Sequence, residues 1–250
     1  RGMQLSGKTV ILMPKRALGL RLQSFLQTRF GLSVLVEQTG GALGIEVSAN
    51  YAVSRTKLQK ARFSKAAKRS ARGGWLVAKD KRATRLFSSG SAPMAEYGAT
   101  TNGLSPAYLD RLDSMAARAA GANGFSPCST SLTWFHLGFI PSVRAIGKQA
   151  SAWIRNWSKA DAETRALWGR GWQQIRDVLT EAPAEERWRR VTSPISATIA
   201  TLLHIGWAPV QPGHWLAKDR SNQAIIGRGD WEDSQIVKAI EEEAELLAWR

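Results

Sequence analysis

The side chains that most often do chemistry in proteins are scattered in this sequence. The three histidines, His136, His204 and His214, have no second metal-ligating residue three or four positions along the chain. Because zinc needs three or four ligands held together, these histidines predict no metal site. The single cysteine, Cys128, cannot form an intrachain disulfide and has no neighbouring base to activate it. We therefore expect packing or surface roles for all four residues.

Carboxylate pairs and a glycine cluster are the next candidates for a site. Asp110 with Asp113, and Asp230 with Asp233, have a spacing typical of first helical turns, so capping is a better interpretation than two-metal catalysis. The glycine-rich stretch 40–44 lacks the Gly-Lys-Ser/Thr of a phosphate loop. It predicts a tight turn before a strand. The residues alone therefore predict no self-sufficient active site.

Positive charge is concentrated in one segment. The 250 residues carry 35 Lys and Arg against 20 Asp and Glu, a formal charge of +15 that excludes an acidic or membrane-buried protein. The segment from Arg55 to Arg85 holds 12 basic residues and one acid, Asp80, and so carries +11. Clustering of one sign is typical of a surface that binds a polyanion.

A helix over this segment would separate basic from small side chains, since residues three and four apart share a face. One stripe holds Arg62, Lys65, Arg69 and Arg72, widened by Lys57, Lys60 and Lys68. The opposite side holds Phe63, Ala66, Ala67 and Ser70. Gly73 and Gly74 are expected to end this helix. A second cluster, Lys79, Lys81, Arg82 and Arg85, is expected to start another helix that runs to Phe87, before a loop over 88–91.

Three interpretations of the basic segment stay open. An ordinary charge run is a solvated helix face, but the acids that normally interleave are missing here. Like charges at these spacings destabilise a helix without a counter-anion, which favours binding to nucleic acid. Nuclear localisation is a further interpretation, compatible with the second. The predicted nucleic-acid-binding residues are Lys57, Lys60, Arg62, Lys65, Lys68, Arg69, Arg72, Lys79, Arg82 and Arg85.

The pattern of apolar residues predicts an α+β fold. Strands are expected at 8–13, 33–37 and 43–48, with a helix over 15–30 closed by Gly31, which makes a small β-α-β-β unit. From about Val53 onward the chain is expected to be mostly helical. Ser105-Pro106 predicts a helix start, with apolar spacing that runs to Gly121. A linker is expected over 121–128.

The second half of the chain is rich in tryptophan. Nine of the eleven tryptophans lie between Trp153 and Trp249. Trp153 with Trp157, and Trp168 with Trp172, are i,i+4 pairs that are more typical of core anchors than of base-stacking platforms. Further predicted elements are N-caps at Ser193 and Asp230, a C-cap at Gly206, and a C-terminal helix over 231–249.

No targeting or membrane segment is expected. The first residues carry no apolar signal core, and the longest stretch without a formal charge, 191–217, is broken by prolines and Gly206. One cysteine fits a reducing compartment, so an intracellular location, nuclear or cytoplasmic, is expected. The start at Arg1, with the first methionine at Met3, resembles a piece cut from a longer reading frame.

Two motifs resemble segments of non-LTR (LINE-type) retrotransposon reverse transcriptases. Residues 5–12, Leu-Ser-Gly-Lys-Thr-Val-Ile-Leu, are similar to the Leu-x-x-x-Lys-Thr strand that follows the catalytic Asp-Asp in this family. Residues 42–47, Ala-Leu-Gly-Ile-Glu-Val, are similar to the family's Leu-Gly-Val/Ile segment that leads to the primer grip. The basic segment follows where the family has its thumb. The resemblance covers 5–120 and is weak beyond.

The resemblance implies an incomplete palm end at 1–50, a basic thumb-like region at 51–121 and a Trp-rich helical region at 122–250. It implies that Lys8 lies near the incoming triphosphate, that Leu43, Gly44 and Ile45 lie near the primer end, and that the basic helix follows the phosphates of an RNA/DNA hybrid. The family's metal-binding aspartates, including Tyr-x-Asp-Asp, have no counterpart here. The chain alone is therefore predicted to bind nucleic acid without polymerising, and Mg²⁺ is expected only in the full-length polymerase.

The implied partners are nucleic acid and the upstream part of the same polyprotein. A first rival function is a stand-alone basic nucleic-acid-binding helical protein unrelated to any polymerase. A second is a protein-interaction module that uses the Trp-rich half, with the basic half only solubilising. Clustering of one sign of charge is an unusual way to build a solubilising surface, which argues against the second.

Overall fold

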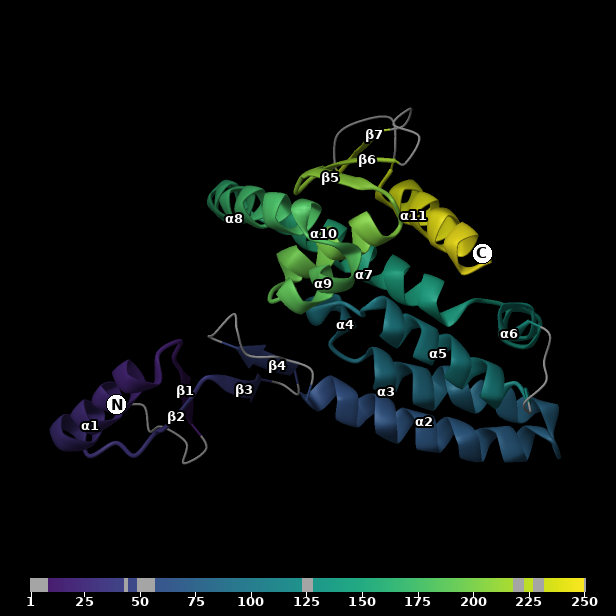
Figure 1. Ribbon diagram of the computed structural model, residues 1–250, viewed down its shortest axis with the longest axis horizontal. Helices are drawn as coiled ribbons and strands as arrows, with labels where there is room; N and C mark the ends of the chain where they lie inside the picture. The colour runs from purple at the N-terminus through teal and green to yellow at the C-terminus, as the bar shows by residue number, and fades with distance from the viewer. Residues whose placement is uncertain are drawn as a thin grey trace. The chain divides into compact units, whose positions relative to one another are not determined.

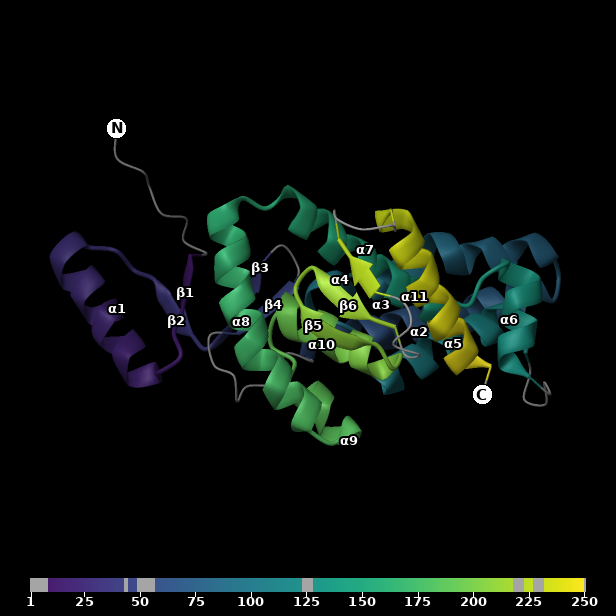
Figure 2. The ribbon, with the colours of Figure 1, turned by 90° about the horizontal axis from the view of Figure 1, so that it is seen from above.

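The computed structural model describes residues 9–42, 45–48, 57–122, 128–217, 223–226 and 232–249. The described chain is mostly helical with a few short strands, so the predicted α+β class is confirmed at that level. It divides into two compact units, Arg1–Ala61 and Arg62–Arg250. Figure 1 and Figure 2 show the elements of each unit from two directions.

Among its described residues, the smaller unit contains one complete helix, two pairs of strands and the start of a second helix. Strand β1 (Val10–Leu12) pairs in parallel with β2 (Leu35–Glu37), and α1 (Arg16–Phe30) connects them. Gly31 ends α1 in the left-handed conformation at φ 65°, as predicted. Strands β3 (Thr39–Ala42) and β4 (Ile45–Ser48) form an antiparallel pair.

The tight turn predicted for residues 40–44 does not begin at Gly40, because residues 40–42 belong to strand β3. Gly40 lies inside β3, and a Cβ atom added there would lie 3.0 Å from a methyl carbon of Leu12. Glycine therefore serves close packing beside Leu12 at this position. The following strand begins at Ile45, while Lys8, Leu43 and Gly44 fall outside the described residues.

Helix α2 (Lys57–Val77) is longer than predicted. Gly73 and Gly74 lie inside α2, so the prediction that they end the helix is wrong. A Cβ atom on Gly74 would lie 2.5 Å from the backbone carbonyl oxygen of Arg118, on a neighbouring helix. The glycine thus permits two backbones to approach closely, and tertiary packing outweighs its poor helix propensity.

The second basic cluster starts a helical segment, as predicted, but that segment is irregular and continues beyond Phe87. A 3-10 turn, η1 (Lys81–Thr84), begins after Asp80, whose side chain accepts a 2.9 Å hydrogen bond from the amide of Arg82. The serines expected in a loop lie in a π-helical turn, η2 (Phe87–Ser91), that buries Phe87 and Ser91. Burial of these two side chains explains why the segment is ordered as a turn of helix. Short helices α3 (Ala92–Glu96) and α4 (Ala99–Asn102) follow.

Helix α5 confirms its prediction. It spans Pro106–Ala119 with Pro106 in its first turn, and its buried side includes Leu109, Leu112 and Met115. Helix α6 (Ser129–Leu137) starts from Cys128 as N-cap, and Gly138 follows it in the left-handed conformation at φ 74°. Residues 123–127 of the predicted linker fall outside the described residues.

The Trp-rich region is a helical layer with a small sheet. The helices are α7 (Pro141–Lys159), α8 (Ala162–Glu181), α9 (Ala184–Arg187), the 3-10 turn η3 (Trp188–Arg190), α10 (Pro194–His204) and α11 (Asp233–Ala248). The antiparallel strands β5 (Ala208–Gln211), β6 (His214–Leu216) and β7 (Gln223–Ile225) lie in that order. Helix α11 runs beside α7 in both views (Figures 1 and 2).

The sequence did not predict this sheet, which is stabilised by a buried aromatic side chain in its central strand. Trp215, in the central strand β6, is fully buried.

The predicted cap at Ser193 is confirmed by a capping box with Ser196, and Gly206 has φ 84° just beyond α10. Helix α11 is capped by Glu232, while the predicted cap, Asp230, falls outside the described residues.

Tryptophans anchor the core of this unit, as predicted. The ring centroid of Trp153 lies 5.5 Å from that of Trp168 and 5.2 Å from that of Trp172. Trp172 is fully buried, and its indole nitrogen donates a 3.1 Å hydrogen bond to the carbonyl oxygen of Pro209. The i,i+4 pairs therefore join α7 to α8.

Candidate nucleic-acid interface

Helix α2 has one buried and one basic side. Phe63, Ala66 and Ser70 are buried, and the Ser70 hydroxyl donates a 2.5 Å hydrogen bond to the carbonyl oxygen of Met115 on α5. The ring centroid of Phe63 lies 4.5 Å from that of Tyr108. These contacts fix the rotation of α2 about its axis, so the basic residues at the opposite positions face solvent.

We call the exposed basic side of α2 within the larger unit the basic face. Its members are Lys65, Lys68, Arg69 and Arg72, continued by Lys79 just after the helix. Arg82 and Arg85 are exposed in the turns that follow. Lys57 and Lys60 are exposed on the first turn of α2, which belongs to the smaller unit.

Two of the predicted arginines lie against other parts of the chain. A guanidinium nitrogen of Arg62 donates a 3.2 Å hydrogen bond to the carbonyl oxygen of Tyr97. The guanidinium carbon of Arg62 lies 4.5 Å from the centroid of the Tyr97 ring. The guanidinium of Arg69 lies against Gly90, 2.8 Å from where a Cβ atom would stand. The prediction that these two arginines contact phosphate stays a prediction, but Lys65, Lys68 and Arg72 are the stronger candidates.

Charge on the basic face is not neutralised by carboxylates of the described chain. Among the residues that the structure describes, no carboxylate oxygen lies within 4.0 Å of the charged nitrogens of Lys65, Lys68 or Arg72. Like charges three and four residues apart on a helix repel one another. An external polyanion would relieve that repulsion, so the geometry fits phosphate binding.

Trp75 is a residue of this surface that the charge pattern of the sequence did not single out. It is 63% exposed, and the Lys79 ammonium nitrogen lies 4.4 Å from its ring centroid. Lys68, Arg72, Trp75 and Lys79 follow one another at spacings of four, three and four residues. The same periodicity that revealed the basic face could therefore have found Trp75.

The residues that the resemblance placed at a polymerase site lie mostly outside the described chain. Lys8, Leu43 and Gly44 fall outside the described residues. Ile45 begins β4 and is partly buried, opposite Ala42 in β3. Their predicted roles at a triphosphate or a primer end stay predictions.

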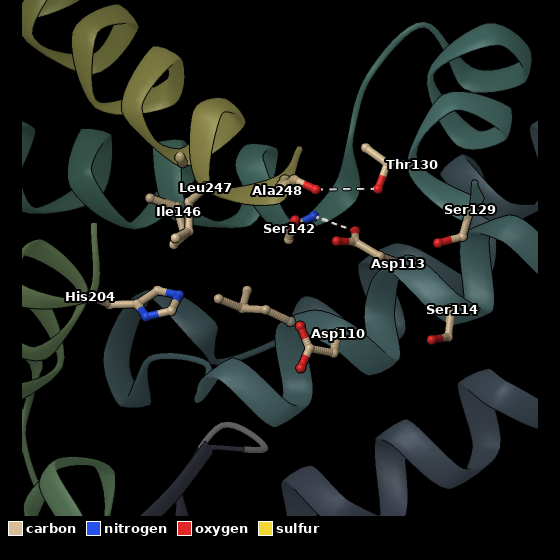
Figure 3. Close-up of a pocket in the computed structure, with 12 residues that line it drawn as sticks. Asp110, Asp113, Ser114, Ser129, Thr130, Ser142, Ile146, His204, Leu247 and Ala248 are labelled. Carbon is tan, nitrogen blue, oxygen red and sulfur yellow. Dashed lines mark hydrogen bonds between the residues drawn. The ribbon is translucent and has the colours of Figure 1, made fainter. Parts of the chain in front are cut away.

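A second candidate is a carboxylate-lined pocket of about 370 Å³ in the larger unit (Figure 3). It is lined by Asp110, Asp113 and Ser114 of α5, Ser129 and Thr130 of α6, Ser142 and Ile146 of α7, His204 of α10, and the end of α11. Asp113 Oδ1 accepts a 2.9 Å hydrogen bond from the amide of Ser142. Burial raises the pKa of Asp113 to about 6.

This geometry corrects the capping prediction for Asp110 and Asp113. They are the fifth and eighth residues of α5, too far along to cap its free amides. Asp113 instead caps the start of α7, whose second residue is Ser142. Asp113 therefore caps a helix, as predicted, but the amide that it binds lies 29 positions further along the chain.

The pocket does not assemble a catalytic pair from the described side chains. Burial lowers the pKa of His204, and Asp110 only partly offsets that effect. Among the described residues, His204 has no hydrogen bond to Asp110 or Asp113; the polar contacts are Asp113 with Ser142, and Thr130 with the carbonyl oxygen of Ala248 at 3.4 Å. The hydrogen bond that the Asp113 carboxylate accepts therefore assigns this side chain to helix capping.

The remaining candidate side chains also lie apart. His136 is exposed on α6 and His214 is partly buried on β6. Cys128 is exposed, its sulfur accepts a 3.5 Å hydrogen bond from the amide of Ser131, and hydrogen bonding to Ser131 lowers the pKa of the thiol. Within the described ranges, no three His, Cys, Asp or Glu side chains group as metal ligands would.

Comparison of the chain with protein-family models, with curated protein sequences and with solved structures finds no match. Of the helices that the structure describes, none combines the length with the apolar character needed to cross a membrane. Function is therefore inferred from the chain's own geometry.

Proposed function

We propose that this chain binds nucleic acid through the basic face of α2 with little dependence on base sequence. The observation that carries the proposal is a row of exposed Lys and Arg side chains, without acidic partners in the described chain, opposite a buried face that includes Phe63, Ala66 and Ser70. Lysine and arginine bind phosphates and release the counterions condensed on the nucleic acid. Such contacts supply affinity and register, and they carry no sequence information.

The resemblance to non-LTR reverse transcriptases gives this proposal a wider setting. We propose that residues 1–50 are the end of a palm and that 51–121 are thumb-like. Support comes from the order of strand, helix and strands before α2. It also comes from the smaller unit itself, where Leu18, Phe25 and Phe30 are more than half exposed, as expected of part of a larger core. A Tyr-x-Asp-Asp motif shortly upstream of Leu5 in the reading frame would support this origin, and its absence would reject it.

The chain alone is proposed not to polymerise. Polymerases align the attacking 3′-hydroxyl and the triphosphate with two metal ions held by aspartates. The sequence has no Tyr-x-Asp-Asp segment to hold them. Nucleotide incorporation by this chain on a primed template would overturn this proposal.

The first experiment measures binding of two ligands, an RNA/DNA hybrid and a single strand of the same length, by fluorescence anisotropy over a series of salt concentrations. The test variant replaces Lys65, Lys68 and Arg72 with alanine. The control variant replaces Lys159, Arg170 and Arg189, three exposed basic residues on other elements, and so removes the same charge.

We expect log K to fall with log salt for the wild-type chain. The slope should become shallower by about two to three in the test variant, since each phosphate contact contributes roughly 0.9. The control variant should keep most of the wild-type slope. Equal losses in both variants would show that net charge alone drives binding, and no binding by the wild-type chain would favour a protein-interaction function for the Trp-rich half.

A further inference from the structure

Trp75 stands out because its ring is on the surface. It is 63% exposed, whereas Trp172, Trp207 and Trp215 are at most 1% exposed and form part of the core. Trp134 and Trp249, the next most exposed of the described tryptophans, are at 47%. Leaving a large aromatic ring in water forgoes the hydrophobic stabilisation that burial would supply. The Trp75 ring is therefore accessible to a ligand, unlike the core tryptophans.

The surroundings of Trp75 are cationic. Lys79 places its ammonium nitrogen 4.4 Å from the ring centroid, which is a cation–π contact. Arg72 is three residues earlier on the same side of α2, and Lys68 is four residues before that. The ring therefore stands within the basic face, flanked along the helix by groups that can bind phosphate.

We infer that Trp75 is a stacking platform for an unpaired base, and that the ligand of the basic face is single-stranded nucleic acid. This inference rests on the proposed nucleic-acid binding and specifies its ligand. Proteins that bind single strands without sequence preference combine a basic track with aromatic rings, because every base has a flat face. Arg72 and Lys68 bind the phosphates of the strand whose base covers the indole.

The geometry disfavours a fully paired duplex at this ring. In a duplex, each base is already stacked between its neighbours, and the grooves expose base edges. A side chain on the outside of a convex helix can cover a base face only where that base is free to turn out. A single strand, an overhang or a loop meets that condition.

The test compares three ligands of equal length: an oligothymidylate, a single strand of abasic sites, and a duplex. The variants are Trp75→Leu, which removes the ring, and Trp75→Phe, which keeps an aromatic face. Trp134→Leu is the matched control, because Trp134 is also exposed but belongs to another helix, α6. Thermal unfolding of each variant is measured alongside.

We expect Trp75→Leu to weaken binding of the oligothymidylate by about 5- to 100-fold, the loss typical of one base–aromatic stack. Trp75→Phe should keep most of the affinity. Binding of the abasic strand, and the salt dependence, should be the same in all variants, since the phosphate contacts are intact. Trp134→Leu should bind all three ligands as the wild-type chain does.

The outcomes separate this inference from the proposal on which it rests. If the wild-type chain binds all ligands with a steep salt dependence and Trp75→Leu changes nothing, the stacking platform is rejected and phosphate binding stands. If the wild-type chain binds none of the ligands, the stacking platform and the proposed nucleic-acid binding are both rejected. A large loss of thermal stability in Trp75→Leu, or a change in its oligomeric state, would assign the ring to a protein contact and reject the inference.

Discussion

The backbone of α2 at Gly74 touches the backbone of α5 at Arg118. A Cβ atom on Gly74 would stand 2.5 Å from the Arg118 carbonyl oxygen, a distance that real Cβ atoms essentially never show. The adjacent Gly73 differs, since a Cβ atom there would meet no other atom within 4 Å. Two neighbouring glycines in one helix therefore have opposite consequences for stability.

We predict opposite signs for alanine at these positions. Gly74→Ala should lower the free energy of unfolding by about 1–3 kcal/mol, because two backbones must separate. Gly73→Ala should raise it by roughly 0.5–1 kcal/mol, since alanine favours helix and fits the space. Denaturant unfolding of both variants measures the two values. A loss of similar size in both would mean that the helices are not in contact at Gly74.

The raised pKa of Asp113 predicts a pH dependence of stability. The folded pKa of about 6 lies above the ordinary aspartate value of 3.8, so the folded state holds this proton more tightly than the unfolded state. The resulting stabilisation is complete below pH 3.8 and is lost as the pH rises through 6. Above that pH, the ionised carboxylate of Asp113 destabilises the fold.

Asp113→Asn separates this charge from the cap. The amide oxygen of asparagine can still accept from the Ser142 amide, so the variant should be more stable than wild type above pH 6 and similar to it near pH 4. Asp113→Ala leaves the Ser142 amide without its acceptor and should be about 1–2 kcal/mol less stable than Asp113→Asn at both pH values. Chemical denaturation across this range measures both, and a difference between wild type and Asp113→Asn that is constant with pH would contradict the assignment.

An ion pair with one buried and one exposed partner predicts an asymmetric response to mutation. The Glu96 carboxylate pairs with the Lys148 ammonium of α7, and their side chains are 7% and 46% exposed. Lys148→Met leaves a buried carboxylate without its partner and should lower the free energy of unfolding by about 2–3 kcal/mol. Glu96→Gln leaves only a solvated ammonium and should cost less. Equal costs would show that the carboxylate is solvated after all.

The tryptophan core predicts a sharp contrast between buried and exposed rings. Trp172→Ala should cost about 3–5 kcal/mol, because it opens a cavity beside Trp153 and removes the hydrogen bond to Pro209. Trp134→Ala, at an exposed position, should change stability by less than about 0.5 kcal/mol. The midpoint and slope of denaturant unfolding report both. Comparable losses would argue against a core centred on Trp172.

Several features of this protein follow from short-range patterns that the sequence displays. The spacing of Phe63, Ala66 and Ser70 determines the buried side of α2 and therefore which lysines face solvent. Pro106 and the apolar residues at 109, 112 and 115 determine where α5 begins and which side it buries. These features depend on periodicity and propensity, which are properties of neighbouring residues.

Other features depend on residues that are distant in sequence. Whether Gly74 ends a helix or admits a neighbouring backbone depends on Arg118, and which helix Asp113 caps depends on Ser142. The strands β5, β6 and β7 were missed because the burial of Trp215 depends on a core that residues of several helices share with it. A local pattern states what a segment prefers, and packing between segments decides which preference is realised. Neighbouring residues therefore determine which side of each helix is apolar. Contacts between distant segments determine which residues that side packs against.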